Sequence, residues 1–357
     1  MNWLSMVANR LIWFVPTLLG LFAIVFTLSR VVPIDPAFLA AGENASVEQV
    51  QKVRERFGFD KPLPVQFLNY VRDVAQGNFG VSMFTQQPIV NDLATRLPAT
   101  LELTLVAVLL AALVGIPLGV LCGLHRNSWL DHVLRVVTVS GLAVASFWFA
   151  MQLQFLFSMK LGWLPLSGRI DGFPPAPVTG LMVVDALVAG DHEALASALQ
   201  HMILPALKLA LPAAATVVRF TRNGVIGVIN SPSVAYQTAM GFPRRVIVWK
   251  YVLRMALTAT VTQLGLIFGI LLAGAVVVET VFDWPGLGAY AVRSILQSDY
   301  NAVMGFTLCT GALFVFINLL VDMLQAAIDP RGAACWIWSS ASPATKRPSS
   351  AQPCSAC

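Results

Sequence analysis

Residues 219–254 read RFTRNGVIGVINSPSVAYQTAMGFPRRVIVWKYVLR. This stretch contains six basic residues and no Asp or Glu, and a strongly apolar segment lies on either side of it. The basic residues are Arg219, Arg222, Arg244, Arg245, Lys250 and Arg254. A basic, acid-free loop between two membrane spans is typical of the cytoplasmic side. The stretch therefore predicts a polytopic membrane protein and also the orientation of its helices.

The middle of this stretch predicts a short helix outside the membrane. Ser231 is suited to the N-cap position and Pro232 to the first helical position. Gly241 and the Pro243 that follows it predict the end of the helix. The interval leaves room for about two to three helical turns. A helix placed in this way suits the docking of a cytoplasmic partner, although an ordinary basic loop that only sets topology fits the same pattern.

The composition supports a membrane protein. Of the 357 residues, 57% are hydrophobic and 11% are charged, and the mean hydropathy is +0.73. Soluble domains carry about 25% charged residues. The formal net charge of +5 does not indicate nucleic-acid binding, because the basic residues sit mainly at the ends of predicted spans. The five cysteines give no disulfide framework, and Cys122 and Cys309 fall inside predicted spans.

Apolar runs predict six transmembrane helices and place both termini in the cytoplasm. The spans are expected at about residues 11–29, 101–124, 136–159, 202–219, 255–278 and 302–322. In the second span Gly115, Gly119 and Gly123 fall on one helix face, where another helix can approach closely. Pro205 and Pro212 interrupt the fourth span, which we therefore expect to face the helix bundle.

The segments outside the spans differ in character. Residues 32–98 predict a small helical extracytoplasmic region, with a capping box at Ser46 and a second helix that starts near Pro64 and ends before Gly77. Residues 220–254 form the basic cytoplasmic loop. The tail, residues 332–357, is rich in Ser, Ala, Pro and Cys and predicts disorder.

The sequence contains no pattern that indicates an enzyme. It has no Gly-x-x-x-x-Gly-Lys-[Ser/Thr] run for ATP and no His/Cys set with metal-ligand spacing. Asp191-His192-Glu193, followed by His201, is better explained as a solvated helix face than as a metal site. We therefore expect no catalytic, cofactor-binding or metal-binding residue.

Ionisable residues are scarce inside the predicted spans. Those present lie near span ends or beside prolines, and they are Glu102, Lys208, Glu279 and Asp322. A proton- or sodium-driven carrier normally needs such groups at mid-depth. The pattern favours a pathway that receives its energy from a partner, and a stand-alone secondary carrier for a small solute is the alternative.

Several runs of residues, in order and at matching spacing, are similar to those of one family. The runs are PTLLG at 16–20, VPIDP at 32–36, FGFDKPLPVQ at 57–66, GNFG at 77–80, RLPATLEL at 96–103, ETVFDWPGLG at 279–288 and DPR at 329–331. On these runs residues 1–331 resemble the membrane permease subunits of binding-protein-dependent ABC importers, in the dipeptide/oligopeptide/nickel subgroup.

The resemblance implies an all-α integral membrane protein with six transmembrane helices, the type I ABC importer permease fold. It implies a bacterial cytoplasmic (inner) membrane location and four kinds of partner: a second homologous permease subunit, two cytoplasmic ABC ATPase subunits, an extracytoplasmic solute-binding protein and the lipid bilayer. Di- or oligopeptides are the usual cargo of the subgroup, and nickel, glutathione-like and opine-like cargoes also occur. The partner subunits would hydrolyse the ATP.

The resemblance also assigns a coupling helix to the loop between the fourth and fifth spans. The residues expected to contact the ATPase are Tyr236, Gln237, Ala239, Met240, Gly241 and Phe242. For Phe242, packing under its own loop is the other interpretation. The chain departs from the family pattern in having no acid within 232–240, in having Met240 where a Lys is common, and in having Thr258-Ala259 in place of a usual Leu-Pro.

The second candidate site is the run after the fifth span. A possible outer gate is expected from Glu279, Asp283, Trp284, Pro285, Gly286 and Gly288. A well-packed turn explains the same residues equally well, and both interpretations stay open at this stage.

Overall fold

The computed structural model describes residues 15–27, 38, 46–57, 60–297 and 299–328. Within these residues the chain is helical, and the single β feature there is an isolated antiparallel bridge between Val81 and Pro88. The predicted all-α class is confirmed. The tail, 332–357, and Gly58 lie outside the described residues.

After the apolar helix Val15–Thr27, two short helices precede the long ones, namely α3 (Val47–Phe57) and α4 (Leu63–Ala75). The predicted capping box at the start of α3 is present, because Gln49 N donates to Ser46 Oγ (3.3 Å) and Ser46 N donates to Gln49 Oε1 (2.8 Å). Gly77 follows α4 with a φ of 80°, as predicted for a residue just past a helix end.

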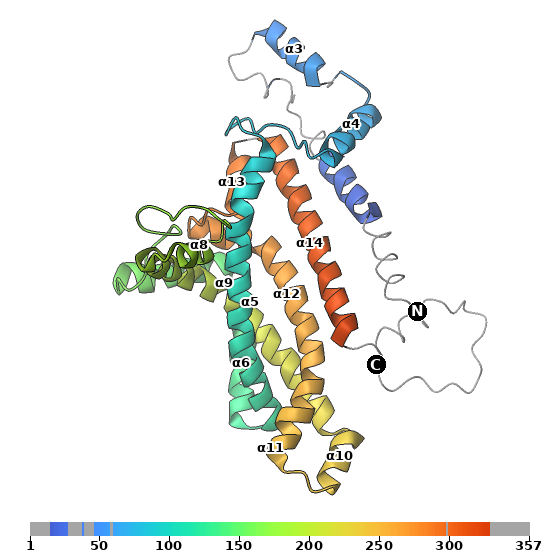
Figure 1. Ribbon diagram of the computed structural model, residues 1–357, viewed down its shortest axis with the longest axis vertical. Helices are drawn as coiled ribbons and strands as arrows, with labels where there is room; N and C mark the ends of the chain where they lie inside the picture. Colours follow the sequence, from blue (N-terminus) through green and yellow to red (C-terminus); the bar gives the residue numbers. More distant parts are fainter. Residues whose placement is uncertain (1–14, 28–37, 39–45, 58–59, 298, 329–357) are drawn as a thin grey trace, which may run out of the picture. The chain divides into compact units, whose positions relative to one another are not determined.

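The remaining helices follow in chain order (Figure 1). They are α5 (Ile89–Leu124), α6 (Trp129–Ala143), α7 (Ser146–Leu153), the π-helix η1 (Gln154–Lys160), α8 (Met182–Ala189), α9 (His192–Ile229), α10 (Pro232–Ala239), α11 (Arg244–Val246), the π-helix η2 (Ile247–Val252), α12 (Leu253–Val281), α13 (Leu287–Leu296) and α14 (Tyr300–Ile328).

Four helical stretches of the described chain are long and apolar enough to cross a membrane: Ile89–Leu124, His192–Ile229, Arg244–Val281 and Tyr300–Val321. They contain the predicted second, fourth and fifth spans and all but the last residue of the predicted sixth. Each is longer than predicted at one or both ends, since hydropathy marks only the apolar part of a helix that continues into water. The predicted first span is described as the shorter apolar helix Val15–Thr27.

The predicted third span is divided in the structure. Residues 136–159 are covered by the end of α6, a break at Val144 and Ala145, then α7 and η1.

The fourth span is the most enclosed of the four. In α9, 67% of the most apolar segment is buried, against 39%, 33% and 22% in the other three. This agrees with the prediction from its prolines, and the helix runs without interruption through Pro205 and Pro212.

The chain divides into two compact units, and several long helices contribute to both. The first comprises the described residues within 1–107, 144–210 and 270–315, and the second comprises the described residues within 108–143, 211–269 and 316–328. The first unit contains a core cluster built on Ile89, Leu93, Leu287, Tyr290 and Ala302.

The second unit contains a core cluster in which α5, α9, α10, η2 and α12 all take part. Its buried members are Val120, Val225, Val234, Ile247, Val252 and Ala256. The predicted glycine face of α5 packs against α9 in the same unit. A Cβ added at Gly115, Gly119 or Gly123 would lie 2.8, 2.6 or 2.7 Å from the Cβ of Val217, Thr221 or Val225, respectively. The glycines therefore allow the two helices to approach at backbone distance.

Candidate functional site

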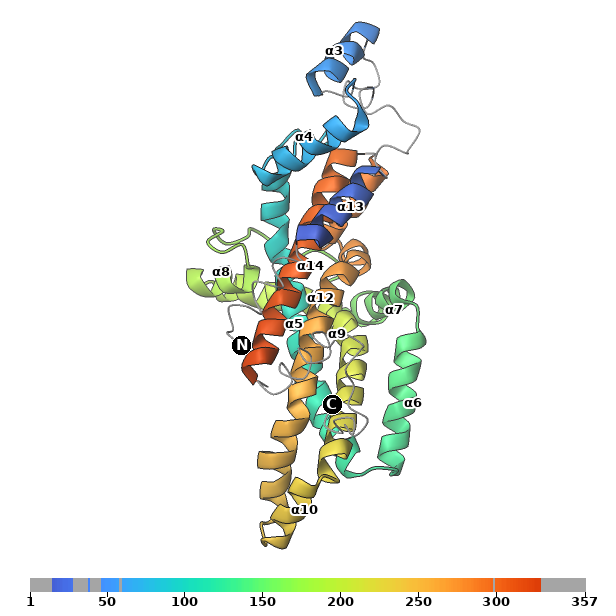
Figure 2. The same ribbon diagram turned by 90° about the vertical axis from the view of Figure 1, so that its right-hand side faces the viewer.

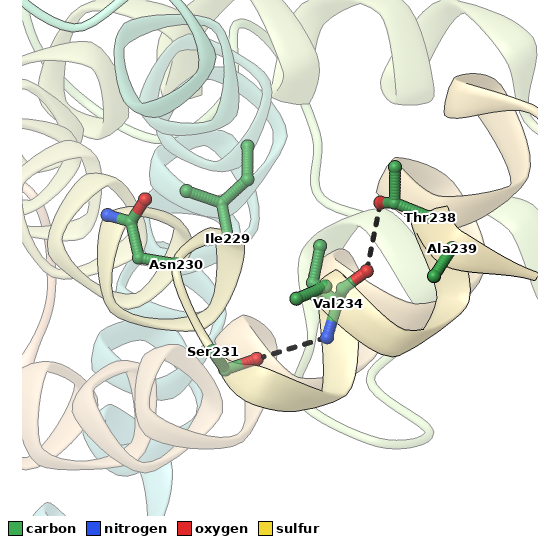
Figure 3. Close-up of a pocket in the computed structure, with 7 residues that line it drawn as sticks. Ile229, Asn230, Ser231, Val234, Thr238 and Ala239 are labelled. Atoms are coloured by element: carbon green, nitrogen blue, oxygen red, sulfur yellow. Dashed lines mark hydrogen bonds between the residues drawn. The ribbon is translucent and has the colours of Figure 1, made fainter.

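The predicted projecting helix is present as α10, and its start is capped as expected. Ser231 is in an extended conformation and its Oγ accepts from Val234 N at 3.5 Å, with Pro232 at the first helical position. Thr238 Oγ1 donates to the carbonyl of Val234 at 2.9 Å (Figure 3). Figure 1 shows α10 and α11 together where the chain passes from α9 to α12. The cap satisfies a backbone group that would otherwise lack a partner at the helix start.

The helix ends at a glycine in a left-handed conformation. Gly241 has a φ of +79°, and the space around its Cβ position is open. A side chain there would therefore be opposed by backbone conformation and not by neighbouring atoms. Pro243 then begins the short α11.

Large apolar side chains of this segment face outward. Tyr236 is 67% exposed and Met240 is 62% exposed, and Phe242 is also exposed. Phe242 nevertheless touches its own loop, since its ring centroid lies 6.2 Å from that of Tyr251. Both interpretations of Phe242 therefore have support, because one part of the ring packs and the rest is open. Exposed aromatic and Met side chains are typical of protein interfaces.

The helix is nevertheless firmly attached to its unit. Val234, on its inner side, is buried in the core cluster with Val225 of α9 and Ile247 of η2. Buried apolar contact therefore joins α10 to the helices on either side of it in the chain.

An open groove lies beside α10. It is lined by Ile229, Asn230, Ser231, Val234, Ala235, Thr238 and Ala239, which come from the end of α9, the turn after it and α10 (Figure 3). Of the six predicted contact residues only Ala239 lines the groove. Tyr236, Met240, Gly241 and Phe242 are exposed outside it, and Gln237 is half-buried.

The second predicted site, after the fifth span, is a buried turn in the first unit. The Glu279 side chain is fully buried and accepts three hydrogen bonds: from Thr100 Oγ1 (2.6 Å), Gly288 N (2.6 Å) and Ala289 N (3.1 Å). The backbone donors belong to the first turn of α13, where a carboxylate is favourable.

Glycine is required at two positions of this turn. A Cβ at Gly286 would lie 2.4 Å from the Glu279 carboxyl carbon, and a Cβ at Gly288 would lie 2.4 Å from the Cα of Val276. The carboxylate can reach the α13 amides only because these side chains are absent.

Trp284 completes the packing. It is fully buried, and its indole Nε1 donates to the carbonyl of Ala99 at 3.0 Å, while Arg169 lies over its ring at 5.6 Å. Asp283 is exposed and pairs with exposed Arg293 at 2.6 Å. Glu279, Trp284, Gly286 and Gly288 thus form a packed unit that favours the packed-turn interpretation, while Asp283 lies outside it.

Matches to known protein families cover nearly the whole chain. Residues 115–333 match the family described as binding-protein-dependent transport system inner membrane component, and residues 3–104 match the N-terminal membrane component of the same systems. The chain belongs to this permease family. The resemblance to ABC importer permeases of the dipeptide/oligopeptide subgroup is thereby confirmed.

Individual relatives of the permease carry peptide-transport names. It is 42% identical over 333 residues to the probable D,D-dipeptide transport system permease protein DdpB of Escherichia coli (strain K12), covering 93% of this chain and 98% of that one. It is 37% identical to the glutathione transport system permease protein GsiC of Salmonella choleraesuis (strain SC-B67), covering 92% and 98%. Among solved structures, a chain of the MetNI methionine ABC transporter matches with a TM-score of 0.49 and 18% identity, covering 65% of this chain and 93% of that chain.

The permease is a multi-pass membrane translocation subunit. Among the residues that the structure describes, no group of three or more His, Cys, Asp or Glu side chains could hold a metal ion. Asp191 acts as a helix cap instead, because its Oδ1 accepts from Ala194 N (2.9 Å) at the start of α9.

Sequence reasoning missed several residues that the structure brings into the permease sites. Trp249 on η2 is exposed and close in sequence to α10, and a lone Trp within the basic stretch was the available signal. The ion pair between Arg169 and Glu102 was also missed, since it joins the segment between η1 and α8 to α5 across 67 positions. No local pattern reports a contact of that range.

Proposed function

We propose that this permease forms half of the translocation pathway of an ATP-driven importer for di- or oligopeptides or a related small solute. The cargo would be delivered by an extracytoplasmic binding protein. Family membership supports the transport role, and the peptide names of relatives, one of them 42% identical, support the cargo class. The proposed location is the bacterial inner membrane, with both termini in the cytoplasm.

The partners proposed are a second homologous permease and two cytoplasmic ATPases. One observation carries the ATPase contact: α10 is a capped, firmly anchored helix that presents Tyr236 and Met240 to solvent within a basic segment. An outward apolar face on a rigid helix is suited to a groove on a partner protein. Arg244, Arg245 and Lys250 are exposed around it, so a partner groove with an acidic rim fits best.

In the proposed cycle the ATPases close on ATP and move α10, and the helices turn from inward- to outward-facing as rigid bodies. The binding protein then releases cargo between the two permeases. Gln237 lies in the same segment, and its half-buried side chain has a buried Oε1 with no hydrogen-bond partner among the described residues.

The test is ATP-driven uptake by the reconstituted complex. The chain, its second permease, the two ATPases and the binding protein are placed in liposomes and supplied with D-alanyl-D-alanine, L-alanyl-L-alanine or glutathione. Uptake of one of these that requires both ATP and binding protein is expected. Uptake by the chain alone, driven by a proton gradient, would refute the proposal in favour of a secondary carrier.

A further inference from the structure

The start of α6 holds a charged residue with an unusual environment. Among the residues of α6 whose side chains the structure describes, Asp131 is the buried one, with 1% of its side chain exposed, while the others are exposed or half-buried. Figure 2 shows α6 running alongside α9. The most buried of the described α6 side chains is therefore a carboxylate.

The partner of this carboxylate is Arg222 of α9. The guanidinium Nε donates to Oδ1 at 2.6 Å and Nη2 donates to Oδ2 at 2.8 Å, so the pair is bidentate. The Arg222 side chain is only 19% exposed. Hydrogen bonds from Arg222, and a weaker one from the backbone N–H of Asn127, hold the pKa of Asp131 well below its usual range. The pair is therefore ionised at any physiological pH.

A bidentate arginine fixes more than a distance. Two parallel hydrogen bonds also set the angle between the guanidinium and carboxylate planes, which a lysine cannot do. Asp131 has a second cationic partner, Arg135, at 3.2 Å. Arg135 is 53% exposed and lies one turn along the same helix, so it cannot join α6 to another element.

Arg222 lies on the part of α9 that packs against α10 and α12. Its neighbour Thr221 contacts Thr260 of α12 through their hydroxyl oxygens at 3.2 Å. Three positions further along, Val225 packs in the same cluster as Val234 of α10. Near Arg222, α9, α10 and α12 therefore form one packed block, and the Asp131–Arg222 ion pair connects that block to α6.

We propose that the Asp131–Arg222 pair passes the movement of the α9–α10 block to α6, which makes Asp131 a positioning residue for transport. This rests on the proposed function, because the movement is the one driven by the ATPases. Without the pair, α10 would still dock and ATP would still be hydrolysed, but α6 would no longer follow α9.

The test measures cargo moved per ATP hydrolysed by the complete complex in liposomes, together with the amount of assembled complex. Asp131→Ala removes the carboxylate, and Arg222→Lys keeps the charge but loses the fork. For both variants we expect normal assembly and continued ATP hydrolysis, while the cargo moved per ATP falls by about tenfold or more. A tenfold change corresponds to about 1.4 kcal/mol, which is less than the free-energy change expected when a buried ion pair is broken. The exchanged pair, Asp131→Arg with Arg222→Asp, should recover part of the loss.

Arg135→Ala is the matched control, because it removes a cation from the same carboxylate without touching the link between helices. The cargo that this variant moves per ATP should stay within about twofold of the value for the unaltered complex, as expected for an exposed ion pair. A purely structural role would lower assembly while leaving cargo per ATP unchanged, and that result in Arg222→Lys would overturn the inference. Absence of ATP-driven uptake in the unaltered complex would instead count against the proposed function.

Discussion

Replacing Glu279 by Ala should destabilise the permease strongly, and the structure gives the size of the effect. The substitution removes a buried acceptor of three hydrogen bonds and leaves Thr100 Oγ1, Gly288 N and Ala289 N without it. The Thr100 hydroxyl oxygen also accepts from Leu287 N (2.8 Å), so its orientation depends on Glu279 as well.

Each hydrogen bond to a charged group contributes about 1.5–3 kcal/mol, and the removal of the carboxylate's own desolvation cost offsets part of the sum. A net loss of about 3–5 kcal/mol in the free energy of unfolding is expected, which is typical when one partner of a buried charged group is deleted. At about 2 °C per kcal/mol for a chain of this size, the midpoint of thermal unfolding should fall by roughly 6–10 °C.

The assay is thermal unfolding of the purified complex, paired with peptide uptake at a temperature where the variant is folded. Asp283→Ala is the control, because its ion pair with Arg293 is exposed and contributes about 1 kcal/mol or less. If Glu279→Ala unfolded at the normal temperature yet changed the rate or selectivity of uptake, the packed-turn interpretation would be wrong and the outer-gate interpretation would be favoured.

Three further outcomes are expected. Gly241→Asp should uncouple ATP hydrolysis from uptake without unfolding the helices, whereas neutral Gly241→Asn, which tolerates the same positive φ, should largely retain coupling in the liposome assay. Gly119→Leu should lower the yield of folded protein by forcing α5 away from α9, at a cost of about 1–3 kcal/mol or more, while Gly274→Ala, with open space at its Cβ, should not. Hydrogen bonds from Thr179 hold the pKa of Asp185 below its usual range. The ionised Asp185 carboxylate therefore stabilises the folded segment above about pH 4, and this stabilisation is lost as the pH falls further. Hydrogen-exchange protection of residues 178–185 should drop between pH 7 and pH 3, and Asp185→Asn should abolish that pH dependence.

The features that the sequence predicted well are local ones. The N-cap at Ser231, the glycine end at Gly241 and the capping box at Ser46 each depend on residues within four positions of one another, and all are present. The four-residue spacing of the α5 glycines also predicted a close helix approach, because helical periodicity places them on one face.

The features that escaped prediction depend on distant pairs. Asp131 and Arg222 are 91 positions apart, and Trp284 and Ala99 are 185 apart. One signal was present: Asp131 is an acid in a loop that is otherwise basic, which the positive-inside pattern does not explain. Helix ends beyond the apolar segment were missed for another reason, since hydropathy reports contact with lipid and not helical hydrogen bonding.

The glycine face of α5 has a consequence for how the second unit can move. Val217, Thr221 and Val225 are β-branched, and each packs against one of these glycines. A Cβ atom placed on the glycine would lie only 2.6–2.8 Å from the Cβ of the facing residue. Sliding one helix along the other by a fraction of a turn would drive these stiff side chains into backbone, and the next matching register lies about 6 Å away, four residues at the helical rise. The α5–α9 interface therefore resists sliding of one helix along the other, but it still allows the two helices to rock about their line of contact.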